Sequence, residues 1–142
     1  MKKILVLNGP NLNMLGKREP DLYGFLSLTD LNVSLRQKAE GMGLNVDFYQ
    51  SNHEGDLVDR IQGLTGEYQG AVLNAGAYTH TSLAIRDAVL SVSVPVIEVH
   101  LTNPHAREHV RRHSFLSGAA IGAIEGFGAR SYELALYWFA TS

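Results

Sequence analysis

Residues 70–100 read GAVLNAGAYTHTSLAIRDAVLSVSVPVIEVH, and this stretch decides the fold. Residues 70–74 and 94–100 are apolar runs of the length of a buried strand, the second with Pro95 near its start. The run between them keeps a helical apolar spacing at Ile85, Ala88, Val89 and Val92. Two strands joined by a helix pair in parallel through a right-handed crossover, so this stretch predicts a βαβ unit.

The same alternation continues on both sides of this unit. Further strands are predicted at 4–7, 44–49 and 119–124, and helices at 28–42, 51–64 and 132–140. Ser27 and Ser51 are each followed three residues later by an acidic residue, which is typical of a helix start. The last helix is apolar on most sides, so it is expected to be packed or shared with another subunit. Five strands alternating with helices predict one α/β domain over residues 1–142 with a parallel sheet.

Composition excludes several classes of function. Lys and Arg number 12 against 14 Asp and Glu, for a net charge of −2, which disfavours a nucleic-acid partner. The absence of Cys excludes disulfides, thiolate metal sites and cysteine nucleophiles. No apolar run reaches the ~18 residues of a membrane-spanning helix. The apolar run after Lys2 and Lys3 is too short for a signal peptide, so a cytoplasmic protein without a membrane contact is expected.

The ligand site of such a sheet lies outside the carboxyl ends of its strands. That rule selects residues 8–24, 74–82 and 100–111. Segment 8–24 is a long polar loop of the kind that is functional or mobile, and we expect it to act as an active-site lid. It carries Arg18 and Tyr23, where a guanidinium near the phenol favours the phenolate and could make a general base. The alternative is a solvated loop with Tyr23 packed on the body of the protein.

The two segments after the third and fourth strands also carry reactive side chains. Asn74 ends a buried strand, and His80 precedes a helix whose free N–H groups suit an anion; the alternative is an ordinary capping cluster. Glu98 and His100 share one side of a strand, where the carboxylate could hold a general acid. The alternative is a strand-end hydrogen bond without a catalytic role.

Asn103-Pro104 predicts the start of a short helix, on which Arg107 and Arg111 would face one way and bind a carboxylate. The alternative is a solvated helix face. A metal site at His105, His109 and His113 is disfavoured, because no Glu follows the first His as in a metalloprotease helix and because neighbouring arginines repel a dication. A glycine-rich dinucleotide fingerprint is absent after the first strand.

Six ordered motifs resemble those of the type II 3-dehydroquinate dehydratases over essentially the whole chain. They are Leu7-Asn8-Gly9-Pro10-Asn11-Leu12-Asn13, Arg18-x-Pro20-x-x-Tyr23-Gly24, Asn52-His53-Glu54-Gly55, residues 74–82, Glu98-Val99-His100-Leu101-Thr102-Asn103, and Arg107-Glu108-x-x-Arg111-x-His113-Ser114. The resemblance implies a flavodoxin-like three-layer sandwich around a five-stranded parallel sheet. It also implies an anti elimination of water from 3-dehydroquinate through an enolate, in the shikimate pathway, with no cofactor and no metal.

The resemblance also implies roles for individual residues. Tyr23 is expected to be the base, Arg18 to depress its pKa, and Asn11 to help stabilise the enolate. His100, held by Glu98, is expected to protonate the departing hydroxyl. Substrate binding is expected from Asn74, His80, Arg111, Arg107 near Tyr23, the backbone of Leu101 and Thr102, and Asp87 reaching a neighbour's site. The assembly implied is a homododecamer of stacked trimers.

Small departures from the family's pattern leave the catalytic set intact. Thr102 stands where many members have Ser, which preserves the hydroxyl, and His109 stands where an acidic residue is frequent. Two other classes of function stay open at this point. One is a flavodoxin-like binding or signalling module that has lost catalysis, and the other is a His-rich metal hydrolase, whose activity a chelator would remove.

Overall fold

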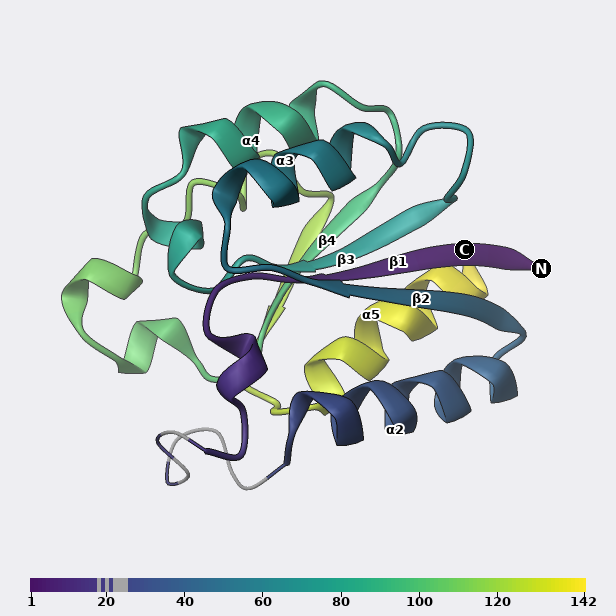
Figure 1. The fold of residues 1–142 in the computed structure, drawn as a ribbon, viewed down its shortest axis with the longest axis horizontal. Coiled ribbons are helices and arrows are strands. Elements are labelled where there is room, and N and C mark those ends of the chain that lie inside the picture. Colours follow the sequence, from purple (N-terminus) through teal and green to yellow (C-terminus); the bar gives the residue numbers. More distant parts are fainter. Residues whose placement is uncertain (18, 20, 22–25) are drawn as a thin grey trace.

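The computed structural model describes residues 1–17, 19, 21 and 26–142. Strands and helices alternate along this part of the chain, as the apolar runs predicted (Figure 1). The strands are β1 (Lys2–Asn8), β2 (Leu44–Gln50), β3 (Gly70–Asn74), β4 (Val96–His100) and β5 (Gly122–Glu125). The α-helices are α2 (Leu28–Gly41), α3 (Glu54–Gln62), α4 (Leu83–Leu90) and α5 (Arg130–Thr141). Among these residues, no helix has the length and apolarity needed to cross a bilayer.

All five strands run parallel in one sheet, in the order β2-β1-β3-β4-β5. Asn8, at the end of β1, lies opposite Gln50 on one side and Asn74 on the other. The chain winds outward from β1 in both directions, which is the flavodoxin-like strand order with its topological switch between β1 and β3. The predicted flavodoxin-like sheet is confirmed, and a crevice is expected where β1 and β3 end.

Helices cover both faces of the sheet, which makes three layers. Figure 1 shows α2 and α5 below the sheet and α3 and α4 above it. Because side chains alternate along a strand, Ile4 and Val6 of β1 pack in the core between the sheet and α2 and α5. Leu5 and Leu7 pack in the core between the sheet and α3 and α4. Both faces of β1 are therefore buried, and its near-continuous apolar sequence follows from that.

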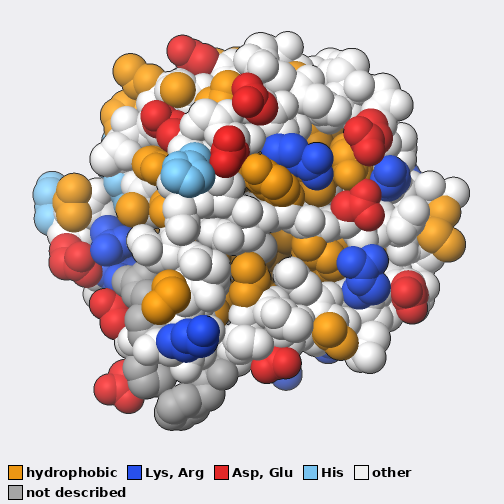
Figure 2. Space-filling model, viewed as in Figure 1, with side chains coloured by type: hydrophobic (Ala, Val, Ile, Leu, Met, Phe, Trp, Pro, Cys, Tyr) orange, Lys and Arg blue, Asp and Glu red, His pale blue; other side chains and the backbone are white. Residues whose placement is uncertain are grey.

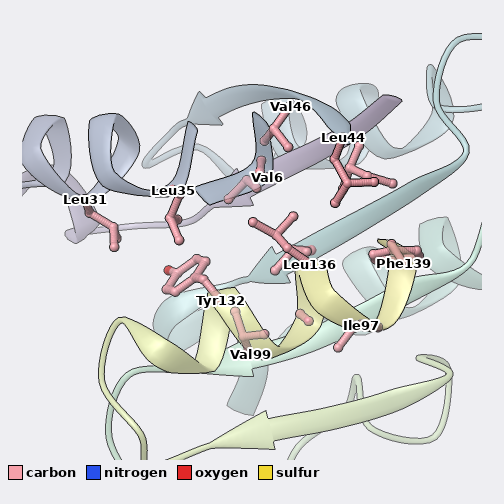
Figure 3. Packing of buried hydrophobic residues seen from close by; sticks show 14 of the residues in the cluster. Val6, Leu31, Leu35, Leu44, Val46, Ile97, Val99, Tyr132, Leu136 and Phe139 are labelled. Carbon is pink, nitrogen blue, oxygen red and sulfur yellow. The ribbon is translucent and has the colours of Figure 1, made fainter. Parts of the chain in front are cut away.

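Helix α5 buries one side and exposes the other. In Figure 3 Tyr132, Leu136 and Phe139 point from α5 toward the strands, and all three are buried. Leu134, Tyr137 and Trp138 lie on the exposed side. The molecular face seen in Figure 2 mixes acidic and basic side chains, in keeping with a net charge of −2.

Of the two helix starts with a serine signal, one follows the prediction and the other does not. Ser27 accepts a hydrogen bond from the Asp30 N–H at 3.0 Å, and so caps α2 as predicted. Ser51 was expected to begin the next helix, but α3 begins at Glu54. The Ser51 hydroxyl instead accepts from the His53 N–H at 3.0 Å and donates to the Asp56 carboxylate at 2.9 Å. Ser51 therefore fixes the turn before α3.

The short helix predicted after Asn103 does begin there, with the Asn103 side chain accepting from the His105 N–H at 3.1 Å, but it ends at Ala106, so the expectation that it carries both Arg107 and Arg111 is wrong. The chain forms two separate 3-10 helices, η3 (Pro104–Ala106) and η4 (His109–Arg111), because hydrogen bonds such as Arg107 N–H to Pro104 O span three residues and the backbone is extended at Arg107. The fifth strand also begins later than predicted, since the N–H groups of Ala119 and Ala120 both bond the Leu116 carbonyl in a turn. Arg107 and Arg111 are thus not neighbours on one helix face.

Candidate active site

A cavity opens at the carboxyl ends of β1, β3 and β4, at the switch point of the sheet. It is lined by Pro10, Asn11, Leu12, Leu15, Asn74, Gly76, Ala77, His80, His100, Leu101, Thr102, Pro104, Arg107 and Arg111. Three sequence segments that were selected for their position after a strand therefore meet in one place. Most of the predicted site residues lie in this lining.

The turns after β1 and β3 pack directly against each other and form one wall. The Gly9 N–H donates to the Asn74 carbonyl at 2.8 Å, and a Cβ at Gly9 would lie 2.5 Å from the Ala75 oxygen. Gly76 has a φ of +58°, and its Cβ would lie 2.9 Å from the Pro10 oxygen. These contacts require glycine on both turns. They place Asn11, whose own φ is +69°, at the cavity, where its N–H donates to Asn52 Oδ1 at 2.9 Å.

Asn74 is oriented by a buried network that reaches α5. Tyr132 accepts from Asn74 Nδ2 at 2.8 Å and donates to Asn8 Oδ1 at 2.6 Å. The Asn74 oxygen accepts from the Gly76 N–H at 3.1 Å. Among the described residues only one N–H of the Asn74 amide has a partner, and the other is available to a ligand, because an amide nitrogen carries two donors. Burial raises the pKa of Tyr132 far above its ordinary value, so this phenol is a neutral hydrogen-bond group and not a base.

His80 lies at the end of the 3-10 helix η2 (Gly76–His80), before Ser82 caps α4. Its Nδ1 is 2.8 Å from the His113 carbonyl oxygen, which can only accept, so we assign the proton to Nδ1. Burial lowers the pKa of His80, with help from electrostatic repulsion by the neighbouring Arg111 and His100 side chains and against the bond to His113. A neutral ring with Nδ1–H leaves Nε2 as a hydrogen-bond acceptor.

Glu98 and His100 form the predicted pair on one side of β4. His100 Nε2 lies 2.6 Å from Glu98 Oε2, and both residues are buried. Burial raises the pKa of Glu98, but hydrogen bonds from His100, Ser117 and Ser114 outweigh it and hold that pKa below the ordinary 4.5. The carboxylate is therefore charged at neutral pH and takes its hydrogen bond from Nε2–H. His100 is left with Nδ1 for a proton transfer.

The arginines reach the cavity from two different turns. Arg107 lies within 3.5 Å of Thr102 Oγ1 and 3.9 Å of the Glu19 carboxylate, and Arg111 donates to Glu108 at 2.9 Å. The bond from Arg111, with help from the charge of Arg107, lowers the pKa of the Glu108 carboxyl. Both guanidiniums line the cavity, so the side chains converge although the predicted helix does not exist. They give this end of the cavity a positive charge suited to a carboxylate.

The remaining predicted residues lie elsewhere. Tyr23 and Arg18 fall outside the described residues. Asp87 is exposed on α4 and does not line this cavity. His105 lies 3.3 Å from the Glu125 carboxylate, and His113 packs edge-on against Phe115. Across residues 1–17, 19, 21 and 26–142, no three His, Asp or Glu side chains gather as a metal site would need.

Some residues of the site carried no signal that would have assigned them a role. Tyr132 was predicted only as the start of the last helix and Ser114 only as part of a motif, and Ser117 lay outside every predicted element. Their partners lie 16 to 124 residues away in the chain. Spacing cannot reveal contacts of that kind, since they depend on how the sheet and α5 come together.

A family model described as dehydroquinase class II matches residues 2–140. The chain belongs to the class II dehydroquinases. This class II dehydroquinase is 55% identical to a curated 3-dehydroquinate dehydratase of Bacillus licheniformis, over 98% of this chain and 96% of that protein. It is 56% identical to one of Acaryochloris marina, over 94% of this chain and 89% of that protein.

Solved structures agree with this membership. The type II dehydroquinase from Propionibacterium acnes matches this class II dehydroquinase with a TM-score of 0.97 and 42% identity, over 100% of this chain and 98% of that chain. A receiver domain of a sensor histidine kinase from Pseudomonas aeruginosa, at 11% identity and a TM-score of 0.54, shares the fold alone. The resemblance drawn from the six sequence motifs is confirmed.

Proposed function

We propose that this chain removes water from 3-dehydroquinate to give 3-dehydroshikimate in the shikimate pathway. The names of its relatives support this substrate. The observation that carries the proposal is the cavity itself, in which His100, held from behind by Glu98, lies beside Asn74, His80 and Arg111. A proton donor next to groups that bind hydroxyls and a carboxylate suits a small hydroxylated acid.

The first step is removal of a proton from the carbon beside the ketone. Tyr23, as a phenolate favoured by Arg18, takes this proton, and the C–H electrons form an enolate. Asn11 stabilises the enolate oxygen, directly or through a water molecule. The support for Asn11 is its place in the cavity lining, on a turn held by the bond from its N–H to Asn52.

The second step is loss of the hydroxyl. The electrons on the enolate oxygen re-form the C=O bond, and the electrons of the enolate double bond move to make the new carbon–carbon double bond. The C–O bond to the hydroxyl breaks, and His100 Nδ1–H gives its proton to the departing hydroxyl so that water leaves. The charged Glu98 carboxylate stabilises the imidazolium that must form beforehand. General-acid catalysis of this kind contributes about 10²–10⁴-fold. The anti course requires Tyr23 to reach the substrate from the face opposite His100.

Binding follows from the donors and acceptors left unused in the network. Asn74 offers one N–H and His80 offers Nε2 to substrate hydroxyls, and Arg111 pairs with the carboxylate. The backbone of Leu101 and Thr102 borders the same space. The ketone already acidifies the proton that is removed, so the proposed chemistry needs neither a cofactor nor a metal.

Other parts of the proposal concern the surroundings of the site. Residues 8–24 act as its lid within a single catalytic domain of residues 1–142, Arg107 closes near Tyr23, and Asp87 reaches the site of a neighbouring subunit in a dodecamer of trimers. The exposure of Asp87 on α4 supports an intersubunit role. We also propose that the enzyme acts in the cytoplasm.

The test mixes the purified chain with 3-dehydroquinate, without added cofactor, and follows the ultraviolet absorbance of the conjugated product. We expect an absorbance rise that a chelator does not abolish; no rise would remove the proposal, and loss on chelation would favour a metal hydrolase. Tyr23→Phe should abolish turnover while substrate still binds by calorimetry. Tyr137→Phe, an exposed tyrosine on α5, is the matched control and should keep the wild-type rate.

A further inference from the structure

One short turn, residues 113–117, contacts His80 of the cavity and the Glu98 carboxylate that holds His100. Its His113 carbonyl accepts the proton of His80 Nδ1 at 2.8 Å. Its two serines donate to the carboxylate that holds His100. The turn is anchored through Phe115, whose N–H donates to the Thr79 carbonyl at 2.9 Å and whose carbonyl accepts from Arg86 at 2.8 Å. These bonds hold the turn in place behind the cavity.

The serines divide the two oxygens of Glu98 between them. Oε2 accepts from His100 at 2.6 Å and from Ser114 at 2.9 Å. Among the described residues, Oε1 accepts a hydrogen bond from Ser117 alone, at 2.7 Å. The carboxylate is 1% exposed, so in the wild type these hydrogen bonds, and not bulk water, hold its two oxygens. Ser117 therefore decides whether Oε1 is satisfied and whether the carboxylate plane stays turned toward His100.

We propose that Ser117 is a positioning residue for proton donation by His100, acting through Glu98. This inference rests on the proposed function, in which His100 gives the proton to the departing hydroxyl. Ser114 supports the same carboxylate, but its hydroxyl also accepts from the N–H groups of Leu116 and Ser117 at 3.0 and 3.1 Å. Removing Ser114 would therefore disturb the turn as well, which makes Ser117 the cleaner position to test.

Other titratable and charged groups surround the carboxylate, and none of them is changed when Ser117 is substituted. They are His100 on the same strand, His80 on η2, Glu125 on β5, and His105, Arg111 and Arg112 on the segment after β4, all bordering a second cavity beside Glu98. Because these groups are the same in the wild type and in Ser117→Ala, a difference in kcat between the two proteins reports the loss of the Ser117 hydroxyl.

The kinetic test compares Ser117→Ala with Ser117→Thr. Ser117 is exposed, so alanine leaves no cavity in the core. We expect kcat to fall about tenfold in Ser117→Ala with KM changed less than about twofold, a part of the ~10²–10⁴-fold that a general acid contributes. Ser117→Thr keeps the hydroxyl and should keep most of kcat. Ser91→Ala removes a serine hydrogen bond at the end of α4, 2.6 Å to the Ala88 carbonyl, and should leave kcat unchanged.

A spectroscopic test separates this inference from the proposed function. A short bond from an imidazole N–H to a charged carboxylate gives a strongly deshielded proton, observable by NMR for His100 Nε2–H. We expect this resonance to move upfield in Ser117→Ala and to return in Ser117→Thr. An unchanged resonance overturns the inference even if the wild type proves inactive on 3-dehydroquinate. Unchanged kcat in an active Ser117→Ala enzyme overturns it as well, and so does an equal loss in Ser91→Ala.

Discussion

Tyr132→Phe tests the buried network behind the cavity. The change removes a hydroxyl that donates to Asn8 at 2.6 Å and accepts from Asn74 at 2.8 Å, and it keeps the ring that packs under the sheet. Each buried group left without its partner costs about 1–3 kcal/mol. Asn8 is 1% exposed and takes the full penalty, whereas Asn74 borders the cavity, where water can relieve part of it. We therefore expect a loss of about 2–4 kcal/mol in the free energy of unfolding.

The measurement is urea denaturation with a parallel thermal scan. At about 4 °C per kcal/mol for a chain of this size, the midpoint should fall by about 8–16 °C. Tyr68→Phe is the matched control, because Tyr68 donates to Asp47 at 2.7 Å but this carboxylate is 41% exposed and can turn to water. It should lose less than about 1 kcal/mol. Tyr132→Phe should also raise KM several-fold, since Asn74 loses the bond that orients it. Equal losses in the two variants, or an unchanged KM, would refute the reasoning.

Two further predictions concern Gly9 and Glu98. Gly9→Ala should lower the free energy of unfolding by about 2–3 kcal/mol in urea denaturation, because the new Cβ would meet the Ala75 carbonyl oxygen. The control is Gly55→Ala in α3, which has open space around it and should be neutral or stabilising. A tolerated Gly9→Ala would contradict the packing of the two turns. The folded-state pKa of Glu98 lies below its ordinary 4.5, so its contribution to stability is complete above about pH 4.5 and is lost as the pH falls through the folded value. Glu98→Gln should flatten this acid part of the stability curve, and an unchanged slope there would show that other carboxyls cause it.

Local patterns predicted the elements of the fold because each signal lies within one element. The two-residue period of a strand was enough to place Glu98 and His100 on one side of β4, and the structure confirms their contact. The rule that ligands bind beyond the carboxyl ends of parallel strands brought three separate segments together correctly. These predictions depend on backbone periodicity and on sheet topology, both of which the sequence expresses directly.

Features set by tertiary contact escaped prediction. The helix expected to carry Arg107 and Arg111 is two 3-10 turns. Both guanidiniums still reach the cavity, so the predicted convergence is right although the helical spacing behind it is not. The bonds from Tyr132 to Asn8 and from Ser117 to Glu98 join residues distant in the chain. Tyr23 and Arg18 lie outside the described residues, so their roles rest on the family's motifs and on the proposed assay.

The contact between the turns at Gly9 and Gly76 has a consequence for engineering. Each glycine lacks a side chain because the backbone of the other turn occupies that space. The two turns are thus complementary surfaces, and a segment transplanted from a relative at one of them will clash or leave a gap unless its counterpart comes with it. Chimaeras designed to alter which small acids the cavity accepts should exchange residues 9–13 and 74–80 as a single unit.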